Sequence, residues 1–252
     1  MLRGLYSAAS GMIAEGVRTD TIANNLANAD TTGFKKDTTV TSEFREMLMQ
    51  RINDGAADAP VVGRMGTGAE AVGNFTNYAS GNFKVTDNPL DMAIEGDGFF
   101  VVNAPQGVRY TRDGSFQLNT RNELVTADGY TVRDQNGASI VAADNTGSVN
   151  VDSMGRVFSG GQEIGQLEVV SFPNKLQLAK EGSNLFRTTA ANAQQQPFTG
   201  KVRQGTIEGS NVNVVQEMVN MISSYRAYEI HSKAVQTHDA LADKAINEVA
   251  KA

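Results

Sequence analysis

Residues 2 to 29 place apolar and small side chains at alternating intervals of four and three, which is the spacing of one face of an α-helix. Gly11 and Gly16 lie within this stretch, and each costs about 1 kcal/mol in a helix interior. The helix is therefore expected to be marginally stable alone and to need a partner along its stripe. The stripe consists of Leu5, Ala9, Met12, Gly16, Thr19, Ala23 and Leu26.

A second helical pattern begins near residue 212 and continues to the end of the sequence. No glycine or proline follows Gly209, so this helix is expected to be better formed than the first. The two stripes can pack against each other or against other copies of the chain. The larger residues of the second stripe are Val214, Met218, Met221, Tyr225, Tyr228 and Val235.

Between these helices, the pattern from residue 81 to residue 205 changes to a period of two. Short alternating stretches are separated by Gly and Asp turns, which predicts a compact β-rich domain. The expected strands are 99–102, 108–111, 115–118, 123–126, 131–133, 148–151, 157–159 and 165–172.

The remaining stretch, residues 34–80, has no sustained periodicity. Residues 43–52 have a short helical pattern, and 53–68 are rich in Gly, Ala and Asp and read as a loop. The sequence thus predicts an α+β chain whose long terminal helices pack as a coiled-coil-like pair around a mostly β centre. Its parts are a helix over 1–33, an irregular linker over 34–80, a β-rich domain over 81–205 and a helix over 206–252.

The composition of the chain excludes several classes of function. The net charge of -6 argues against nucleic-acid binding, and the absence of cysteine excludes disulfides and thiolate chemistry. No apolar run approaches the ~20 residues of a membrane span. The uncharged stretch after Arg3 has the outline of a signal peptide. Because its amphipathic spacing continues past Glu15, we interpret it as part of the mature fold, so export would need a route without a cleaved leader.

The sequence contains few candidate catalytic or ligand-binding residues. Gly96-Asp97-Gly98 and Gly66-Thr67-Gly68 do not continue into a phosphate-binding loop and are read as turns. His231 and His238 lie seven residues apart, whereas helical metal ligands are typically three or four apart. No nucleophile elbow is present. We therefore expect no catalytic residue, no metal and no cofactor, and a chain that is not an enzyme.

Three separated stretches carry a resemblance. Residues 22–35 read IANNLANADTTGFK; residues 97–100 and 110–116 read DGFF and YTRDGSF; residues 209–214 read GSNVNV, followed by RAYE at 226–229. Together, and in this order, they resemble the flagellar basal-body rod and hook protein family.

The resemblance implies an axial structural subunit of the flagellar basal body, exported unfolded by the flagellar type III apparatus. It implies terminal helices packed into a hollow tube that transmits torque and forms part of the export channel wall, with the β-domain outside. Its partners would be copies of itself, neighbouring rod and hook-basal-body subunits, and the export apparatus. The length suits the two rod proteins that have a single β-domain and is short for a hook protein. Of the two, the proximal-rod member is preferred, with a distal-rod or hook-type axial protein as the alternative.

The residues expected at the subunit interface come from both ends of the chain. Asparagines near a helix end are ordinarily capping or polar-face residues, but the resemblance favours contacts with other subunits. Methionine and tyrosine suit adaptable contacts with unlike neighbours. The predicted interface residues are Leu5, Met12, Asn24, Asn25, Leu26, Asn28, Phe34, Asn211, Asn213, Met218, Met221, Tyr225, Tyr228 and Val235.

Two other functions fit the same architecture. An extracellular β-domain binding module on a coiled-coil base would form a small closed oligomer instead of an open polymer. An enzyme with an unrecognised site in the β-domain would need a cleft with several convergent polar groups, which the sequence does not reveal.

Overall fold

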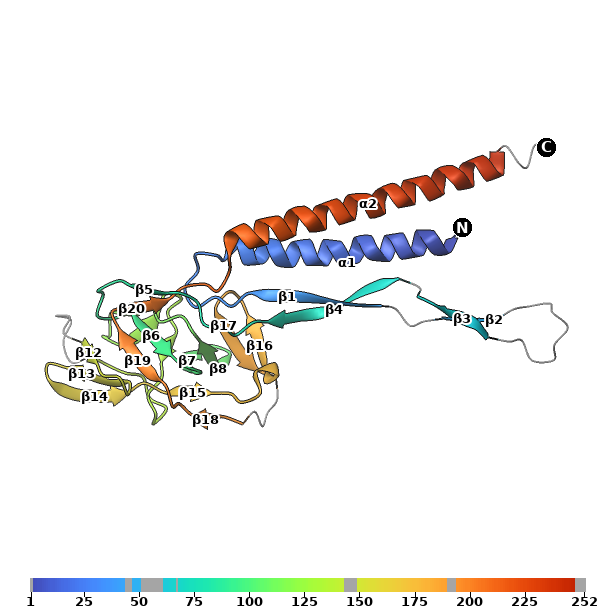
Figure 1. Ribbon diagram of the computed structural model, residues 1–252. Coiled ribbons are helices and arrows are strands. Elements are labelled where there is room, and N and C mark those ends of the chain that lie inside the picture. The colour runs from blue at the N-terminus through green and yellow to red at the C-terminus, as the bar shows by residue number, and fades with distance from the viewer. Residues whose placement is uncertain are drawn as a thin grey trace. The chain divides into compact units, whose positions relative to one another are not determined.

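The computed structural model describes residues 2–43, 47–50, 61–66, 68–142, 149–189 and 194–247 (Figure 1). The chain forms two compact units. The first comprises residues 1–26, 37–75 and 213–252, and the second comprises residues 27–36 and 76–212. Helices occupy the two ends of the sequence and strands the middle, which confirms the predicted α+β class.

The first unit contains helix α1 (Leu2–Ala27) and helix α2 (Val214–Asn247). They lie side by side and run in opposite directions (Figure 1), with a hydroxyl contact of 3.0 Å between Thr19 and Ser224. Asn213 precedes α2, and its side-chain oxygen accepts a hydrogen bond from the Gln216 N–H at 3.1 Å. This is the geometry of an N-cap, and it explains why the helix begins at residue 214.

The first unit also contains two pairs of β-strands. Because these strands lie within residues 34–80, the expectation of an irregular linker there was wrong. Strand β1 (Asp37–Glu43) pairs with β4 (Ala69–Thr76), and β2 (Met47–Gln50) pairs antiparallel with β3 (Val61–Met65). The sequence predicted a short helix over 43–52, but the described residues of this stretch lie in strands β1 and β2. Cross-strand pairing, which a single-segment periodicity cannot reveal, decides its conformation. Residues 53–60, half of the loop predicted over 53–68, lie outside the described residues, and residues 61–65 of that loop form β3.

The β1–β4 ribbon packs on α1 through small polar side chains. The Thr39 hydroxyl hydrogen-bonds with the Thr21 hydroxyl at 2.8 Å and with the Asn74 side-chain oxygen at 2.9 Å. Closer to the start of α1, the Ser10 hydroxyl accepts a hydrogen bond from the Ala69 N–H at 3.2 Å. A two-stranded ribbon is marginally stable in water, so these contacts with the helix supply part of its stability.

The second unit is built on a sheet of nine described strands, in the order β16-β17-β8-β7-β11-β10-β9, with β15 paired to both β7 and β18. The pairings between these strands are antiparallel in the described part of the chain. The strands are β7 (Phe99–Ala104), β8 (Gly107–Thr111), β9 (Phe116–Leu118), β10 (Leu124–Thr126), β11 (Thr131–Val132), β15 (Val169–Ser171), β16 (Leu178–Glu181), β17 (Leu185–Thr188) and β18 (Gln196–Pro197).

Smaller sheets complete the unit. A three-stranded sheet contains β12 (Val149–Val151), β13 (Arg156–Ser159) and β14 (Gln162–Gln166). Strand β19 (Lys201–Gln204) pairs with β6 (Met92–Glu95), and β20 (Thr206–Glu208) pairs with β5 (Phe83–Val85). A 3-10 turn over Lys175–Gln177 precedes β16. The predicted strand over 165–172 is divided between β14 and β15.

Alternate residues of β7 point to opposite faces of the sheet and enter two separate cores. Phe100 and Val102 belong to one cluster, while Phe99 and Val101 belong to the other. The Phe100 ring meets the Phe116 ring edge-on, with 5.1 Å between their centroids. Because both faces of β7 are covered, this strand is apolar at consecutive positions.

The Phe100 side chain is fully buried, so Phe100→Ala is expected to lower the free energy of unfolding by about 3–5 kcal/mol, since it removes apolar contacts and leaves a cavity. Chemical denaturation of the purified protein measures the change. Leu176→Ala is the control, because Leu176 is 75% exposed and its loss should stay within about 0.5 kcal/mol. Equal effects of the two substitutions would contradict this placement of the core.

Candidate functional site

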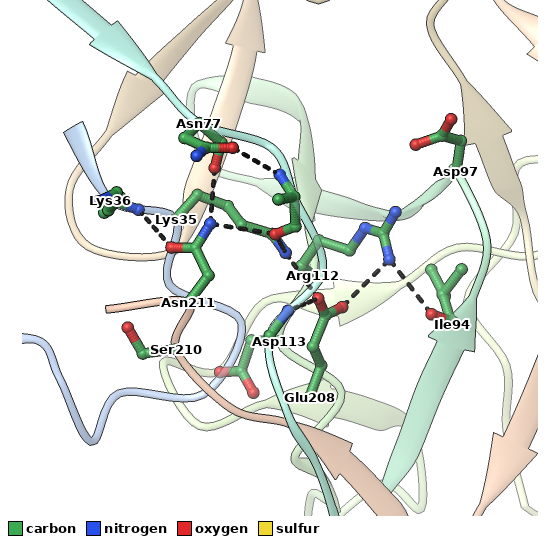
Figure 2. A network of polar contacts seen from close by, with 12 residues as sticks. Lys35, Lys36, Asn77, Ile94, Asp97, Arg112, Asp113, Glu208, Ser210 and Asn211 are labelled. Carbon is green, nitrogen blue, oxygen red and sulfur yellow. Dashed lines mark hydrogen bonds and ion pairs between the residues drawn. The ribbon is translucent and has the colours of Figure 1, made fainter. Parts of the chain in front are cut away.

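A buried polar junction lies in the second unit, formed by Lys35, Arg112, Asp113, Glu208 and Asn211 (Figure 2). These residues come from the three stretches of sequence that carry the family resemblance or lie next to them. Residue 35 follows α1 along the chain, residues 112 and 113 follow β8, and residues 208 and 211 precede α2. The junction thus joins the beginning, middle and end of the chain within one unit.

The Glu208 carboxylate is the centre of the junction. One carboxylate oxygen accepts hydrogen bonds from the Lys35 ammonium at 2.6 Å and from the Gly81 N–H at 2.9 Å. The other accepts from the Arg112 guanidinium at 3.1 Å. Lys35, Arg112 and Glu208 are each no more than 2% exposed. One buried carboxylate therefore serves two buried cations, and Figure 2 shows it between them.

The Arg112 guanidinium has further partners. It donates to the carbonyl oxygens of Ile94 at 3.2 Å and Gly96 at 2.6 Å, and it lies over the Phe99 ring at 5.3 Å from the centroid. The ring face is electron-rich and attracts a cation. Arg112 is thus held by a carboxylate, two carbonyls and an aromatic ring, and these contacts offset part of the cost of burying its charge.

Lys35 is less well compensated. Its ammonium also donates to the Ala79 carbonyl at 2.9 Å. Burial lowers the pKa of the Lys35 ammonium from its ordinary value of 10.5, and the Glu208 carboxylate opposes this shift without cancelling it. Two cations and one carboxylate leave an excess of positive charge, which is why the neighbouring Arg112 also acts to lower the pKa of Lys35.

Asp113 fixes the turn that carries Arg112. One of its carboxylate oxygens accepts from the Thr32 hydroxyl at 2.7 Å and from the Ser115 N–H at 3.0 Å and hydroxyl at 2.6 Å. The other accepts from the Asn184 side chain at 2.8 Å. The Thr32 contact adds a second polar link between the segment that follows α1 and the β-rich unit.

Asn211 links the segment before α2 to the same region. Its side-chain oxygen accepts from the Lys36 N–H at 2.8 Å, and its amide donates to the carbonyls of Asn77 at 2.8 Å and Ala79 at 3.0 Å (Figure 2). A single asparagine therefore satisfies three backbone groups. These contacts fix the segment before α2 to the segment after α1 and to residues 77–79.

The helices of the first unit present a second feature, an outer face of large exposed apolar residues. Val215 is 73% exposed, Ile230 67% and Tyr225 60%. Apolar side chains gathered on an exposed surface indicate a contact surface. The outer face consists of Tyr6, Ile13 and Val17 on α1, and of Val214, Val215, Met218, Val219, Ile222, Tyr225, Tyr228, Ile230, Leu241 and Ile246 on α2.

Three family sequence profiles match the chain in order. Residues 5–35 match "Flagella basal body rod protein", residues 93–159 match "Flagellar hook protein FlgE/F/G D1 domain", and residues 203–248 match "Flagellar basal body rod FlgEFG protein C-terminal". The flagellar basal-body rod protein FlgG of Borreliella burgdorferi is 39% identical over 261 residues, an alignment that covers 95% of this chain and 96% of the relative.

The chain belongs to the flagellar basal-body rod protein family. The rod protein FlgG of Bacillus subtilis is 35% identical, with 98% of this chain and 99% of the relative covered. The rod protein FlgF of Caulobacter vibrioides is 35% identical, with 100% and 99% covered. The protein is therefore a structural axial subunit of the rod in the bacterial flagellar basal body, and a binding module on a coiled-coil base is not favoured.

Several side chains that we expected at the subunit interface are used within the rod protein itself. Both amide atoms of Asn25 pair with the backbone of Asp37, at 2.7 and 2.9 Å. Phe34 is fully buried, with the Lys180 ammonium 3.5 Å from its ring centroid. Asn211 belongs to the polar junction. These intrachain contacts account for all three residues, so we remove them from the proposed interface.

The other residues predicted at the subunit interface differ in their role and in their exposure. Asn213 caps α2, and Asn28 accepts a hydrogen bond from the Thr31 hydroxyl at 3.2 Å, so both have the helix-end role that their residue type suggests. Leu5, Met12, Leu26, Met221 and Val235 are half-buried. The side chains of four residues are exposed and stay candidates for contacts with neighbouring subunits. They are Asn24, Met218, Tyr225 and Tyr228.

Sequence reasoning missed the role of Glu208. Lys35 and Arg112 lie inside the motifs that carried the resemblance, but Glu208 lies just before the last motif and was not singled out. The available signal was a charged residue at the end of a short β-type stretch, Thr206–Glu208. An acid in that position is ordinarily a solvent-facing residue, so the sequence alone did not distinguish it.

Within the described ranges, no group of three His, Cys, Asp or Glu side chains could hold a metal ion. In the same ranges, no helix has both the length and the apolarity needed to cross a membrane.

Glu208→Gln is expected to lower the free energy of unfolding by about 3–5 kcal/mol, because it leaves two buried cations without a counter-charge. Denaturant titration of the purified rod protein measures the loss. Asp97→Asn is the matched control, since Asp97 pairs with Lys175 at the surface and an exposed pair contributes at most about 1 kcal/mol. A loss of similar size in both variants would contradict the central role of Glu208.

Lys35→Met tests the lowered pKa of the ammonium. At pH values between that lowered pKa and 10.5, the unfolded chain holds the proton on Lys35 and the folded chain does not. The native protein should therefore gain stability relative to Lys35→Met as the pH rises through this window. Parallel denaturations of the two proteins at a series of alkaline pH values give the difference. A difference that is constant or falls with pH would show that burial does not control this lysine.

Proposed function

We propose that this rod subunit assembles by burying the outer face of α1 and α2 against neighbouring subunits. The supporting observation is the exposure of large apolar residues along both helices, on the side away from their mutual contact. Burial of each Val, Leu, Ile or Met side chain contributes about 1.5–3 kcal/mol. Repeated at every subunit, such contacts supply the free energy of a stable tube.

The partners in this proposal are other copies of the chain and neighbouring rod and hook-basal-body subunits. Methionine and tyrosine on the outer face support contacts with unlike neighbours, because both side chains adapt to different surfaces. The assembled subunits would transmit torque and form part of the wall of the export channel. Delivery by the flagellar export apparatus without a cleaved leader, and a proximal position along the rod, remain predictions from the sequence resemblance.

We also infer that the protein has no catalytic activity. The family is structural, and the buried titratable groups of the polar junction are paired with one another. Paired carboxylate and ammonium groups inside a core stabilise a fold, whereas catalytic groups face a space that a substrate can enter.

Tyr225→Asp is expected to reduce incorporation of the subunit into rods by at least about tenfold, since it places a charge within a buried contact. Electron microscopy of isolated basal bodies and swimming assays measure the effect, and the exported amount of each variant is quantified in parallel. Tyr225→Phe keeps the ring and should assemble normally. Gln194→Asp adds the same charge at an exposed polar site outside the two helices and is the control for charge alone. Normal rods in the Tyr225→Asp strain would contradict the proposal.

A further inference from the structure

The two histidines of α2, for which the sequence suggested no use, each lie over a glycine of α1. A Cβ atom added to Gly4 would stand 2.6 Å from Nε2 of His238, and one added to Gly11 would stand 2.7 Å from Cε1 of His231. Real Cβ atoms do not approach other atoms this closely. Each imidazole ring therefore fills the space that any other residue on α1 would use for its own side chain.

These contacts repeat along the pair. Gly4 and Gly11 are seven residues apart, as are His231 and His238, and the order is reversed between the helices because they are antiparallel. The next contact along the helix pair joins Thr19 to Ser224. Ser224 is seven residues before His231 in the sequence. We call these six residues the inner seam. Its heptad spacing on α2 is that of a coiled coil, but its side chains are small or polar.

One ring nitrogen of His238 is not held by a hydrogen bond. Its Nδ1 atom is buried and has no hydrogen-bond partner among the described residues. Neighbouring buried positions on α1 are alanines, Ala8 and Ala14, which give a smooth surface. Two smooth helix faces can pair in several registers, whereas a ring that fits only over a glycine permits few.

Gly16 provides the contrast. A Cβ atom added there would meet nothing within 4 Å, although Gly16 has the same unfavourable helix propensity as Gly4 and Gly11. A side chain at Gly4 or Gly11 would therefore force the imidazole ring opposite it to move, whereas a side chain at Gly16 would displace nothing. The same helix therefore contains two test positions and a matched control.

We propose that the pairs Gly4–His238 and Gly11–His231 set the register of α1 against α2. The register decides which side chains of the two helices stand next to each other on the outer face, and hence the shape of the surface offered to neighbouring subunits. The proposal rests on the proposed function for this consequence, while the register itself is a property of a single chain. The histidines are positioning residues that act through helix pairing.

Disulfide trapping measures the register directly, because the chain has no cysteine of its own. The reporter is Thr19→Cys with Ser224→Cys, whose hydroxyls are 3.0 Å apart in the native chain. The register-shifted reporter is Thr19→Cys with Asn220→Cys, four residues away along α2. Both are introduced into the full-length subunit, and basal bodies isolated from the cells are oxidised and separated on non-reducing gels. An in-register bond within one subunit gives a monomer-sized band.

The native background is expected to give the in-register bond and little of the shifted one. Gly11→Ala should lose most of the in-register bond, Gly16→Ala should keep it, and Gly11→Ala combined with His231→Ala should restore it by making room for the added methyl group. Where Gly11→Ala prevents incorporation into rods, the combined variant should restore incorporation, and that restoration counts as the same result.

Three outcomes would overturn the proposal. They are equal behaviour of Gly11→Ala and Gly16→Ala, failure of His231→Ala to rescue Gly11→Ala, and an in-register bond that appears only as a cross-linked dimer. Each is distinct from failure of the proposed function, which the Tyr225 variants test by rod assembly without reference to the register of the pair.

Discussion

The second unit depends on one buried carboxylate. Glu208 receives the charges of both Lys35 and Arg112, and neither cation could remain ionised in an apolar interior without it. The two cations lie far apart in the sequence, so satisfying both forces the segment after α1, the turn after β8 and the strand before α2 to meet. This requirement explains why residues 27–36 belong to the β-rich unit although the helix that precedes them belongs to the other.

The two units use polar and apolar side chains in opposite ways. The β-rich unit has two apolar cores, one on each face of β7, and keeps its buried charges in the junction. In the helical unit, small and polar residues form the described contacts between α1 and α2, while the outer face carries large exposed apolar residues. The first arrangement is that of a self-sufficient domain, and the second suits a surface completed by other subunits.

Much of the fold was predictable from the sequence because long periodic segments report their own structure. The helices and the strands from Phe99 to Ser159 followed from spacing and turn residues. The strands over 37–43 and 69–76 did not, because a ribbon held to a helix by Thr39, Thr21 and Asn74 has no strong alternation of its own. The face on which α1 meets α2 was hidden as well. The apolar stripe through Met218 and Tyr225 dominates the hydrophobic pattern, and the stripe through Ser224, His231 and His238 is too polar to be read as a packing surface.

The candidate site was predictable only in part for a similar reason. Motif residues such as Lys35 and Arg112 could be marked as important, but their shared partner depends on three-dimensional proximity across 173 and 96 positions of the sequence. The asparagines illustrate the converse. Asn25 and Asn211 were expected to contact other subunits, yet in this structure their side-chain amides bond to backbone groups of the same chain.

The charges on the terminal helices have a consequence for a polymer built from them. Helix α1 carries two basic and two acidic residues, and α2 carries three basic and four acidic ones, so most of the net charge of -6 lies elsewhere in the chain. Copies packed side by side through nearly neutral helices repel one another little, and dissolved ions have little repulsion or attraction to screen. A tube assembled in this way should hold together over a wide range of ionic strength.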